Sequence, residues 1–431
     1  MFTQKSHIAL RVVAGLLALL SLGPVERADA QAPLLPELQR TARRARTDPA
    51  PHRDYARALL RAGQFRAAER EFKVAARLSR NDPAALLEVA DAVFATGDWN
   101  ASRRACTALE RATEQNSAWS RVCRAKAYLV GQRSARAFEE LEIVLREMPD
   151  LPQAHLALGD AHRFRADTEN ALSAYRRAAA LDPSSAAPHL GMGLLYEATG
   201  RRAEAIAALR EAQRLEGTWP EVQRALGHIV GGEEGLALLR AAAEGYPTWA
   251  LAQAELGRAE QRAGHLAEAR AALTRALALD ADLAPAHATL GRVQFAEGDN
   301  PAAEASFRRA LELVPNDAET AVALADLFAA TERYEEALEG YRSAADMSPS
   351  DPSPLLAGAR LAARLNRTLF ATAYLDRALE QHPGHLATLE LYGDVMLARN
   401  DRTRARAYYT EALQRATDED LVRIRAKLAG L

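Results

Sequence analysis

The sequence has few of the residues that interrupt helices, with only 24 glycines and 19 prolines among 431 residues. Nearly half of the residues are apolar, so the chain lacks the composition of a linker or of a disordered polymer. It also lacks an excess of positive charge. The formal net charge is −2, which disfavours a broad basic face for nucleic acid. An ordered, mainly helical protein is therefore predicted.

Catalytic and nucleotide-binding signatures are also missing. The chain contains no H-E-x-x-H, no G-x-S-x-G and no G-x-x-x-x-G-K-[ST] motif. The one close histidine pair, His382 and His385, has no cysteine or carboxylate nearby, which disfavours a metal site. We therefore predict a protein without catalytic residues, cofactor or bound metal. An enzyme of another kind would need polar groups with perturbed pKa values clustered in a pocket.

Long apolar runs are absent except near the N-terminus. Residues 12–22 are apolar, follow Lys5 and Arg11, and precede the small-x-small sequence that ends at Ala30. This pattern is typical of a cleaved secretory signal peptide, residues 1–30. An uncleaved membrane anchor is disfavoured because spanning a bilayer takes about 20 apolar residues. We therefore expect a periplasmic or secreted protein, cleaved after Ala30.

A repeat of about 34 residues runs from residue 49 to residue 419. Residues 152–185 show it well, with two amphipathic helices, a short polar turn between them and Pro183 at the end. A helix pair this short cannot bury its apolar stripe alone, so the copies must stack on one another. The eleven units are 49–82, 83–116, 117–151, 152–185, 186–219, 220–249, 250–283, 284–317, 318–351, 352–385 and 386–419.

Small and large residues alternate where the helices must touch. The eighth residue is small in ten of the eleven units, with Arg124 as the exception. Small side chains at that place let two helix backbones approach closely. Large residues in the second helices, such as Phe72, Tyr175 and Tyr409, are predicted to fill the gap to the next unit.

The sequence resembles the tetratricopeptide repeat family. Leu158-Gly159, Leu226-Gly227, Leu256-Gly257 and Leu290-Gly291 match the Leu-Gly element of its first helix, and alanine, an aromatic and a closing proline follow in the second. The resemblance implies an all-α, right-handed solenoid of about eleven stacked helix-turn-helix repeats. It also implies a concave face, lined by the first helices, that binds a partner.

The predicted organisation has caps at both ends and an irregular unit near the middle. Unit 220–249 lacks four residues between its helices, so its first helix should end near Gly231-Gly232. A local change of pitch is the simpler interpretation, and a hinge is the alternative. The segments are the capping helix within 31–48, repeats 1–5 at 49–219, the short repeat at 220–249, repeats 7–11 at 250–419, and a second cap at 420–431.

Cys106 and Cys123 are the only cysteines. They lie at equal distances from the turn at Glu114-Gln115, so they should face each other on two antiparallel helices. A disulfide and two buried free thiols both fit this placement, and export would permit the disulfide. Trp219 and Trp249, which flank the short repeat, are predicted to be packing residues rather than ligand platforms.

The predicted function is a protein-protein interaction scaffold of the bacterial envelope that holds a peptide or helix of a partner protein. A carbohydrate or cell-wall binder that stacks sugars on Phe94, Tyr128, Phe164 and Phe295 is the alternative. Arginine and aromatic side chains dominate binding hot spots. The candidate groove residues are Arg53, Arg57, Arg61, Asp91, Phe94, Tyr128, Asp160, Arg163, Phe164, Arg258, Arg262, Arg292, Phe295, Asp326, Arg360, Arg364 and Asp394.

Overall fold

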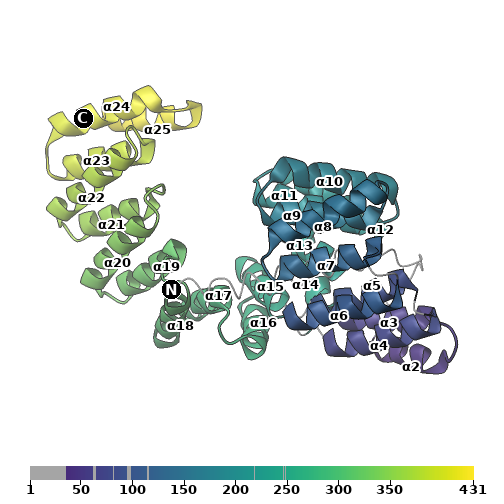
Figure 1. The fold of residues 1–431 in the computed structure, drawn as a ribbon. Helices are drawn as coiled ribbons and strands as arrows, with labels where there is room; N and C mark the ends of the chain where they lie inside the picture. The colour runs from purple at the N-terminus through teal and green to yellow at the C-terminus, as the bar shows by residue number, and fades with distance from the viewer. Residues whose placement is uncertain are drawn as a thin grey trace. The chain divides into compact units, whose positions relative to one another are not determined.

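The computed structural model describes residues 35–431 apart from 62–64, 81, 95–98, 114–115, 218, 246 and 248. Within these residues the chain forms 24 helices and no strand (Figure 1). The predicted signal peptide lies outside the described residues. Among those described, no helix has the length and apolar character needed to cross a membrane.

The contacts between residues divide the chain into two compact units. Unit 1 ends at Ala259 and unit 2 begins at Glu260, so the division falls within α15. The helices up to that division are α2 Leu35–Arg44, α3 Ala50–Arg61, α4 Phe65–Leu78, α5 Pro83–Phe94, α6 Trp99–Ala112, α7 Ala118–Val130, α8 Ser134–Glu147, α9 Pro152–Phe164, α10 Thr168–Leu181, α11 Ala187–Ala198, α12 Arg202–Leu215, α13 Pro220–Val230, α14 Gly232–Gly245 and α15 Ala250–Arg262. The later helices are α16 Leu266–Leu279, α17 Ala284–Ala296, α18 Asn300–Leu313, α19 Ala318–Ala330, α20 Tyr334–Met347, α21 Ser353–Arg364, α22 Thr368–Gln381, α23 Leu386–Ala398, α24 Arg402–Arg415 and α25 Asp418–Ala429.

In each unit the helices form antiparallel pairs that stack in chain order. In unit 1, α3 packs against α4, α9 against α10 and α13 against α14, and α4, α6, α8, α10 and α12 each also pack on the first helix of the next pair. In unit 2, α17 to α24 repeat this arrangement (Figure 1). The prediction of an all-α solenoid of helix pairs is therefore confirmed.

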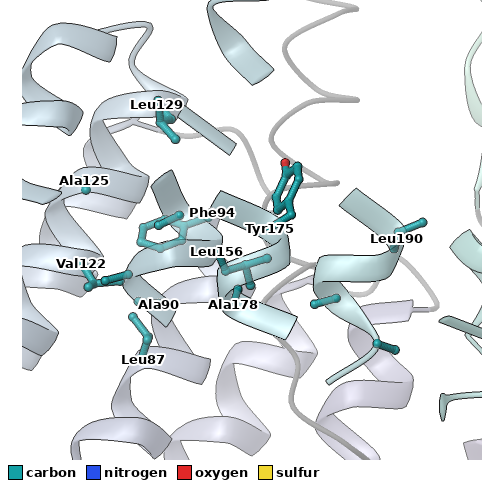
Figure 2. Close-up of a cluster of buried hydrophobic side chains, with 14 of the residues drawn as sticks. Leu87, Ala90, Phe94, Val122, Ala125, Leu129, Leu156, Tyr175, Ala178 and Leu190 are labelled. Carbon is teal, nitrogen blue, oxygen red and sulfur yellow. The ribbon is translucent and has the colours of Figure 1, made fainter. Parts of the chain in front are cut away.

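The core of each unit follows the alternation of small and large residues. Phe72, Tyr175 and Tyr409 are fully buried. A Cβ atom built on Gly159 would lie 2.5 Å from the ring of Tyr175, so only glycine allows this approach of α9 to α10. Figure 2 shows Tyr175 within the buried cluster of unit 1. The predicted contacts between small and large residues therefore position the helices of a pair.

The exception at Arg124 is a shift of register. Repeat 3 has one extra residue before α7, whose N-cap is Ser117. The fully buried small residue is therefore Ala125, which Figure 2 shows in the core. Arg124 points away from the core and binds Glu140 and Glu110.

Most turns within the pairs use one residue in the left-handed backbone region. Gly200, Gly264 and Gly298 have φ between 73° and 83°, and the equivalent Ala166 and Glu332 have φ of 57° and 62°. In the short repeat, α13 ends at Val230, just before the glycine pair. Gly231 (φ 68°) and Gly232 (φ 61°) both have positive φ, which glycine adopts at little cost.

Helices also occupy the two segments for which caps are predicted. Helix α2, Leu35–Arg44, lies within the predicted segment 31–48 and packs on α3. Helix α25 begins at Asp418, two residues before the predicted start of the second cap, and its Ile424 is fully buried.

Candidate functional site

The first helices of successive repeats approach each other more closely than the second helices do. In unit 1, α5 contacts α7 and α7 contacts α9. In unit 2, α17 contacts α19 and α21 contacts α23. Elements that lie closest together in a curved stack are on the inner side of the curve. The first helices, which carry the candidate residues, therefore form the inner face of each unit.

Two of the predicted groove arginines join repeat 1 to repeat 2. Arg53 donates to the carboxylate of Glu88 through Nε and Nη2, at 2.8 and 2.7 Å. Arg57 donates to the same carboxylate at 2.8 Å, and both Arg57 and Glu88 are buried. Charge-assisted bonds of this kind are strong and geometrically specific. The side chain of Arg61 lies outside the described residues.

Aligned residues of α5, α7 and α9 form a row of alternating charge in unit 1, which we call the first charge row: Asp91, Lys126 and Asp160. Each of the three is only 1% exposed. Lys126 Nζ donates to Asp91 Oδ1 at 2.9 Å. The hydroxyl of Tyr175 donates to Asp160 Oδ1 at 2.7 Å. Asp91 and Asp160 thus stabilise the stack and are buried away from the groove surface.

Burial raises the pKa of Asp160 to about 6. Three neighbours act against this shift, because the positive charges of Arg163 and Lys126 and the hydrogen bond from Tyr175 all lower the pKa. Arg163 Nε also donates to the Tyr175 hydroxyl at 3.2 Å. The removal of the carboxylate from water is the largest effect, since an ionised group loses hydration when buried.

The predicted aromatic surfaces of unit 1 differ in accessibility. Phe94 is fully buried between the first helices (Figure 2), which corrects the expectation that its ring lines the groove. Tyr128 is half-buried and stacks on Trp99, with ring centroids 5.7 Å apart. Phe164 is 37% exposed. These three rings therefore do not form a row of accessible stacking surfaces for sugars.

Unit 2 has a corresponding second charge row, made of Asp326, Arg360 and Asp394 on α19, α21 and α23. Asp326 and Arg360 are exposed and Asp394 is half-buried. The same tyrosine bond recurs, because Tyr341 donates to Asp326 at 2.5 Å and Tyr409 to Asp394 at 2.6 Å. This row therefore reaches the surface of the inner face.

Other candidates divide into paired and free side chains. Arg292 donates to Glu319 at 2.8 Å, and Phe295 is half-buried in a small cluster of unit 2. Lys427 of α25 binds both oxygens of Asp394 at 2.7 Å. Among the candidate arginines whose side chains are described, those of Arg258, Arg262, Arg360 and Arg364 have no hydrogen bond or ion pair to another described residue.

Two lysines that form ion pairs on this face were not predicted from the sequence. Lys126 and Lys427, two of only four lysines in the chain, each bind the aspartate of the preceding repeat. Their spacings from Asp91 and Asp394 are close to one repeat. Comparing the same position in successive units would have revealed the alternation of charge.

Two of the histidines that share a position in their repeats make local hydrogen bonds. His155 and His287 bond through Nε2 to the carbonyls of Pro149 and Ala281, six residues earlier. His382 and His385 contact each other ring to ring, with centroids 6.4 Å apart. In the described part of the chain, no cluster of three or more potential metal ligands occurs.

Cys106 and Cys123 are joined by a disulfide in the structure. Their Cα atoms are 5.5 Å apart, which is the usual separation for a disulfide. The bond links α6 of repeat 2 to α7 of repeat 3, next to the first charge row. Of the two states that the sequence leaves open, the structure has the disulfide.

The tryptophans next to the short repeat are structural. Trp219 is fully buried in the core of unit 1. Trp249 is half-buried beneath the guanidinium of Arg224, which lies 5.4 Å from the ring centroid. Arg224 in turn pairs with Glu255 at 2.9 Å, so these contacts tie α13 to α15.

Comparison with known proteins gives the family and the fold. No curated protein matches the sequence. Similar solved structures include the crystal structure of the yeast Tom70, at 14% identity and a TM-score of 0.47, covering 89% of this chain and 95% of that chain. Another is the crystal structure of the APC/C hetero-tetramer Cut9-Hcn1, at 16% identity and a TM-score of 0.52, covering 84% of this chain and 81% of that one. At this identity the second likeness concerns the fold alone.

Two family models match the sequence, and both describe a tetratricopeptide repeat. One matches residues 54–117, 124–186 and 288–352, and the other matches residues 165–229. Together they cover more than half of the chain. The chain therefore belongs to the tetratricopeptide repeat family, whose members generally act as protein-interaction modules.

Proposed function

We propose that this protein is a non-catalytic scaffold that binds an extended segment or a helix of a partner protein on the inner face of unit 2. The observation that carries the proposal is the exposure of Arg360 and Arg364 on α21. They lie four residues apart, so both side chains are on one face of the helix. Neither has a hydrogen bond or ion pair with another described residue.

Unit 1 supports this choice by contrast. There Arg53 and Arg57 both bind Glu88, and Lys126 binds Asp91. Charged side chains that already have buried partners contribute little to binding a further molecule, because the existing bonds would have to break. Exposed arginines with free donors are available to a carboxylate or to a backbone carbonyl of a partner.

The test is site-specific photo-cross-linking in the cells that produce the protein. A photoreactive amino acid replaces Arg360 or Arg364 in one set of variants, and Arg342 or Glu380 on the second helices in the control set. The inner positions are expected to capture one protein that the outer positions do not. The same products from both faces would contradict the proposal. For a captured partner, the double variant R360E/R364E should weaken binding at least about tenfold, by roughly 1.4 kcal/mol.

We further propose that the protein works in an oxidising compartment of the bacterial envelope after cleavage of residues 1–30. The disulfide between Cys106 and Cys123 supports this, because cytosolic thiols are kept reduced. Mass measurement after alkylation, with and without reductant, tests both parts. Protein purified from its native source should start at Gln31 and take up alkylating groups at the cysteines only after reduction. Free thiols in the native protein would contradict the proposed location.

A further inference from the structure

The outer face of unit 2 carries an exposed apolar pair. Leu369 and Phe370, in the first turn of α22, are 77% and 56% exposed. Large apolar side chains exposed next to each other have no role in the core of the repeat. Contiguous apolar groups bordered by polar residues mark interaction sites more often than isolated ones do.

The corresponding positions of other repeats are not apolar in this way. They hold Glu169-Asn170 in repeat 4, Ala203-Glu204 in repeat 5 and Glu335-Glu336 in repeat 9. Stacking of helix pairs requires nothing large at these positions, since those repeats stack without it. Leu369 and Phe370 are therefore a particular feature of repeat 10.

Charges of opposite sign flank this pair on the neighbouring second helices. Helix α20 carries one arginine and four acidic residues, which are Glu335, Glu336, Glu339 and Asp346. Helix α24 carries one acidic residue and four arginines, which are Arg402, Arg404, Arg406 and Arg415. The outer face of unit 2 thus has an acidic helix, an apolar pair and a basic helix in successive repeats.

We propose that this outer face binds a second copy of the same chain, with a two-fold axis at Phe370. A two-fold axis brings each residue near the axis against its own equivalent and exchanges the helices on either side. The apolar pair would then meet its own copy. The acidic α20 would face the basic α24 of the second copy, and the reverse contact would occur on the other side of the axis.

The proposed contact would have an apolar centre and oppositely charged helices at its edges. An apolar centre within a charged rim is the usual composition of a protein interface. The rim charges also fix the orientation, because a parallel arrangement would place like charges together. All four acidic residues of α20 already pair within their own unit, Glu335 with Arg367, Glu336 with Arg333, Glu339 with Arg342 and Asp346 with Arg377. Exposed pairs of this kind contribute little stability, so they can exchange partners at small cost.

The first test is the assembly state of the full mature chain by sedimentation velocity over a concentration series. We expect a monomer-dimer equilibrium. The variant F370E places a carboxylate at the apolar centre and should weaken dimerisation about 30-fold or more, the effect of losing one interface hot spot. The matched control is L279E, at an exposed leucine of α16 outside the proposed face, which should leave the equilibrium unchanged.

A charge exchange tests the two-fold geometry directly. Variant one, E335R/E336R, makes both flanking helices basic, and variant two, R404E/R406E, makes both acidic. Each variant alone should be monomeric because like charges would meet across the axis. An equimolar mixture should form a heterodimer, because α20 of either chain then faces an oppositely charged α24.

Three results would overturn the proposal. A wild-type chain that stays monomeric at all concentrations would show that the apolar pair does not bind a second copy. A dimer that F370E does not weaken would use another surface. A mixture of the two charge variants that remains monomeric would contradict the two-fold arrangement. Circular dichroism of each variant, compared with the wild type, separates these results from misfolding.

Discussion

The first charge row and the second charge row differ in their contact with water. Asp91, Lys126 and Asp160 are each 1% exposed, whereas Asp326 and Arg360 are exposed. Both rows occupy the same place in the repeat and alternate in sign. The same pattern of charge therefore holds repeats together in unit 1 and remains accessible in unit 2.

The residues one turn further along the first helices differ for the first two members of each row. In unit 1 the residues three positions after Asp91 and Lys126 are Phe94 and Leu129, which are buried and cover the row. In unit 2 the residues three positions after Asp326 and Arg360 are alanines. Residues three apart are neighbours on a helix surface, so a large side chain there excludes water and a methyl group does not. At these four positions, burial of the charge therefore follows the size of the residue three positions later.

The largest expected effect comes from removing the central charge of the buried row. Lys126→Ala leaves Asp91 and Asp160 buried without the ammonium between them, and should destabilise unit 1 by about 3–5 kcal/mol. Urea unfolding followed by tryptophan fluorescence measures this, because all four tryptophans precede residue 260. The counterpart Lys427→Ala, at a half-exposed pair, should cost about 1 kcal/mol by circular dichroism. Equal losses would remove the distinction between the rows.

Removing a tyrosine hydroxyl should give the next largest difference. Tyr175→Phe takes away the hydrogen bond to the buried carboxylate of Asp160 and should cost about 2 kcal/mol. Tyr409→Phe takes away the equivalent bond, but Asp394 keeps Lys427, so the cost should be about 0.5 kcal/mol. Urea midpoints of the two variants test this order. A larger loss of stability in Tyr409→Phe than in Tyr175→Phe would contradict the view that the more deeply buried hydrogen bond contributes more.

The pH dependence of unit 1 provides a sharper test of the buried carboxyl. The folded pKa of Asp160, about 6, is above the unfolded value near 4, so protonation favours the folded state. The stability that the protonation of Asp160 contributes is fully present below pH 4 and is lost as the pH rises through 6. Lowering the pH from 7 to 5 should therefore stabilise the wild type by about 1 kcal/mol relative to Asp160→Asn. Asp394→Asn is the control, and an unchanged pH profile in Asp160→Asn would contradict the prediction.

The smallest expected effect should be the same in both units. Ala166 in unit 1 and Glu332 in unit 2 have positive φ at the turn where Gly200 and Gly298 stand in other repeats. Replacing either with glycine relieves the backbone cost, partly offset by greater freedom of the unfolded chain, and should stabilise by about 0.5 kcal/mol. Differential scanning calorimetry measures both. A gain in one unit and a loss in the other would show that the turns are not equivalent.

Much of the fold could be predicted from the sequence because its determinants are local and periodic. Gly159 and Tyr175 recur at fixed positions, and this spacing predicts helix pairs that must stack. The site was less predictable. Phe94 and Asp160 share the residue types and helix positions of groove residues, but neighbouring helices cover them. The shift from Arg124 to Ala125 was hidden by a single inserted residue, which changes the register without changing the pattern.

The sequence alone determined the repeat, the helix pairs and the family, because 34-residue periodicity of small and large side chains has few other structural solutions. Only the tertiary structure decided which charges are buried and which remain on the surface. It also joined Cys106 to Cys123, where the sequence allowed either a disulfide or free thiols, and left Leu369 and Phe370 exposed on α22. Whether a charge is buried depends on how its own helix and the neighbouring helices pack around it, and this packing exists only once the repeats stack.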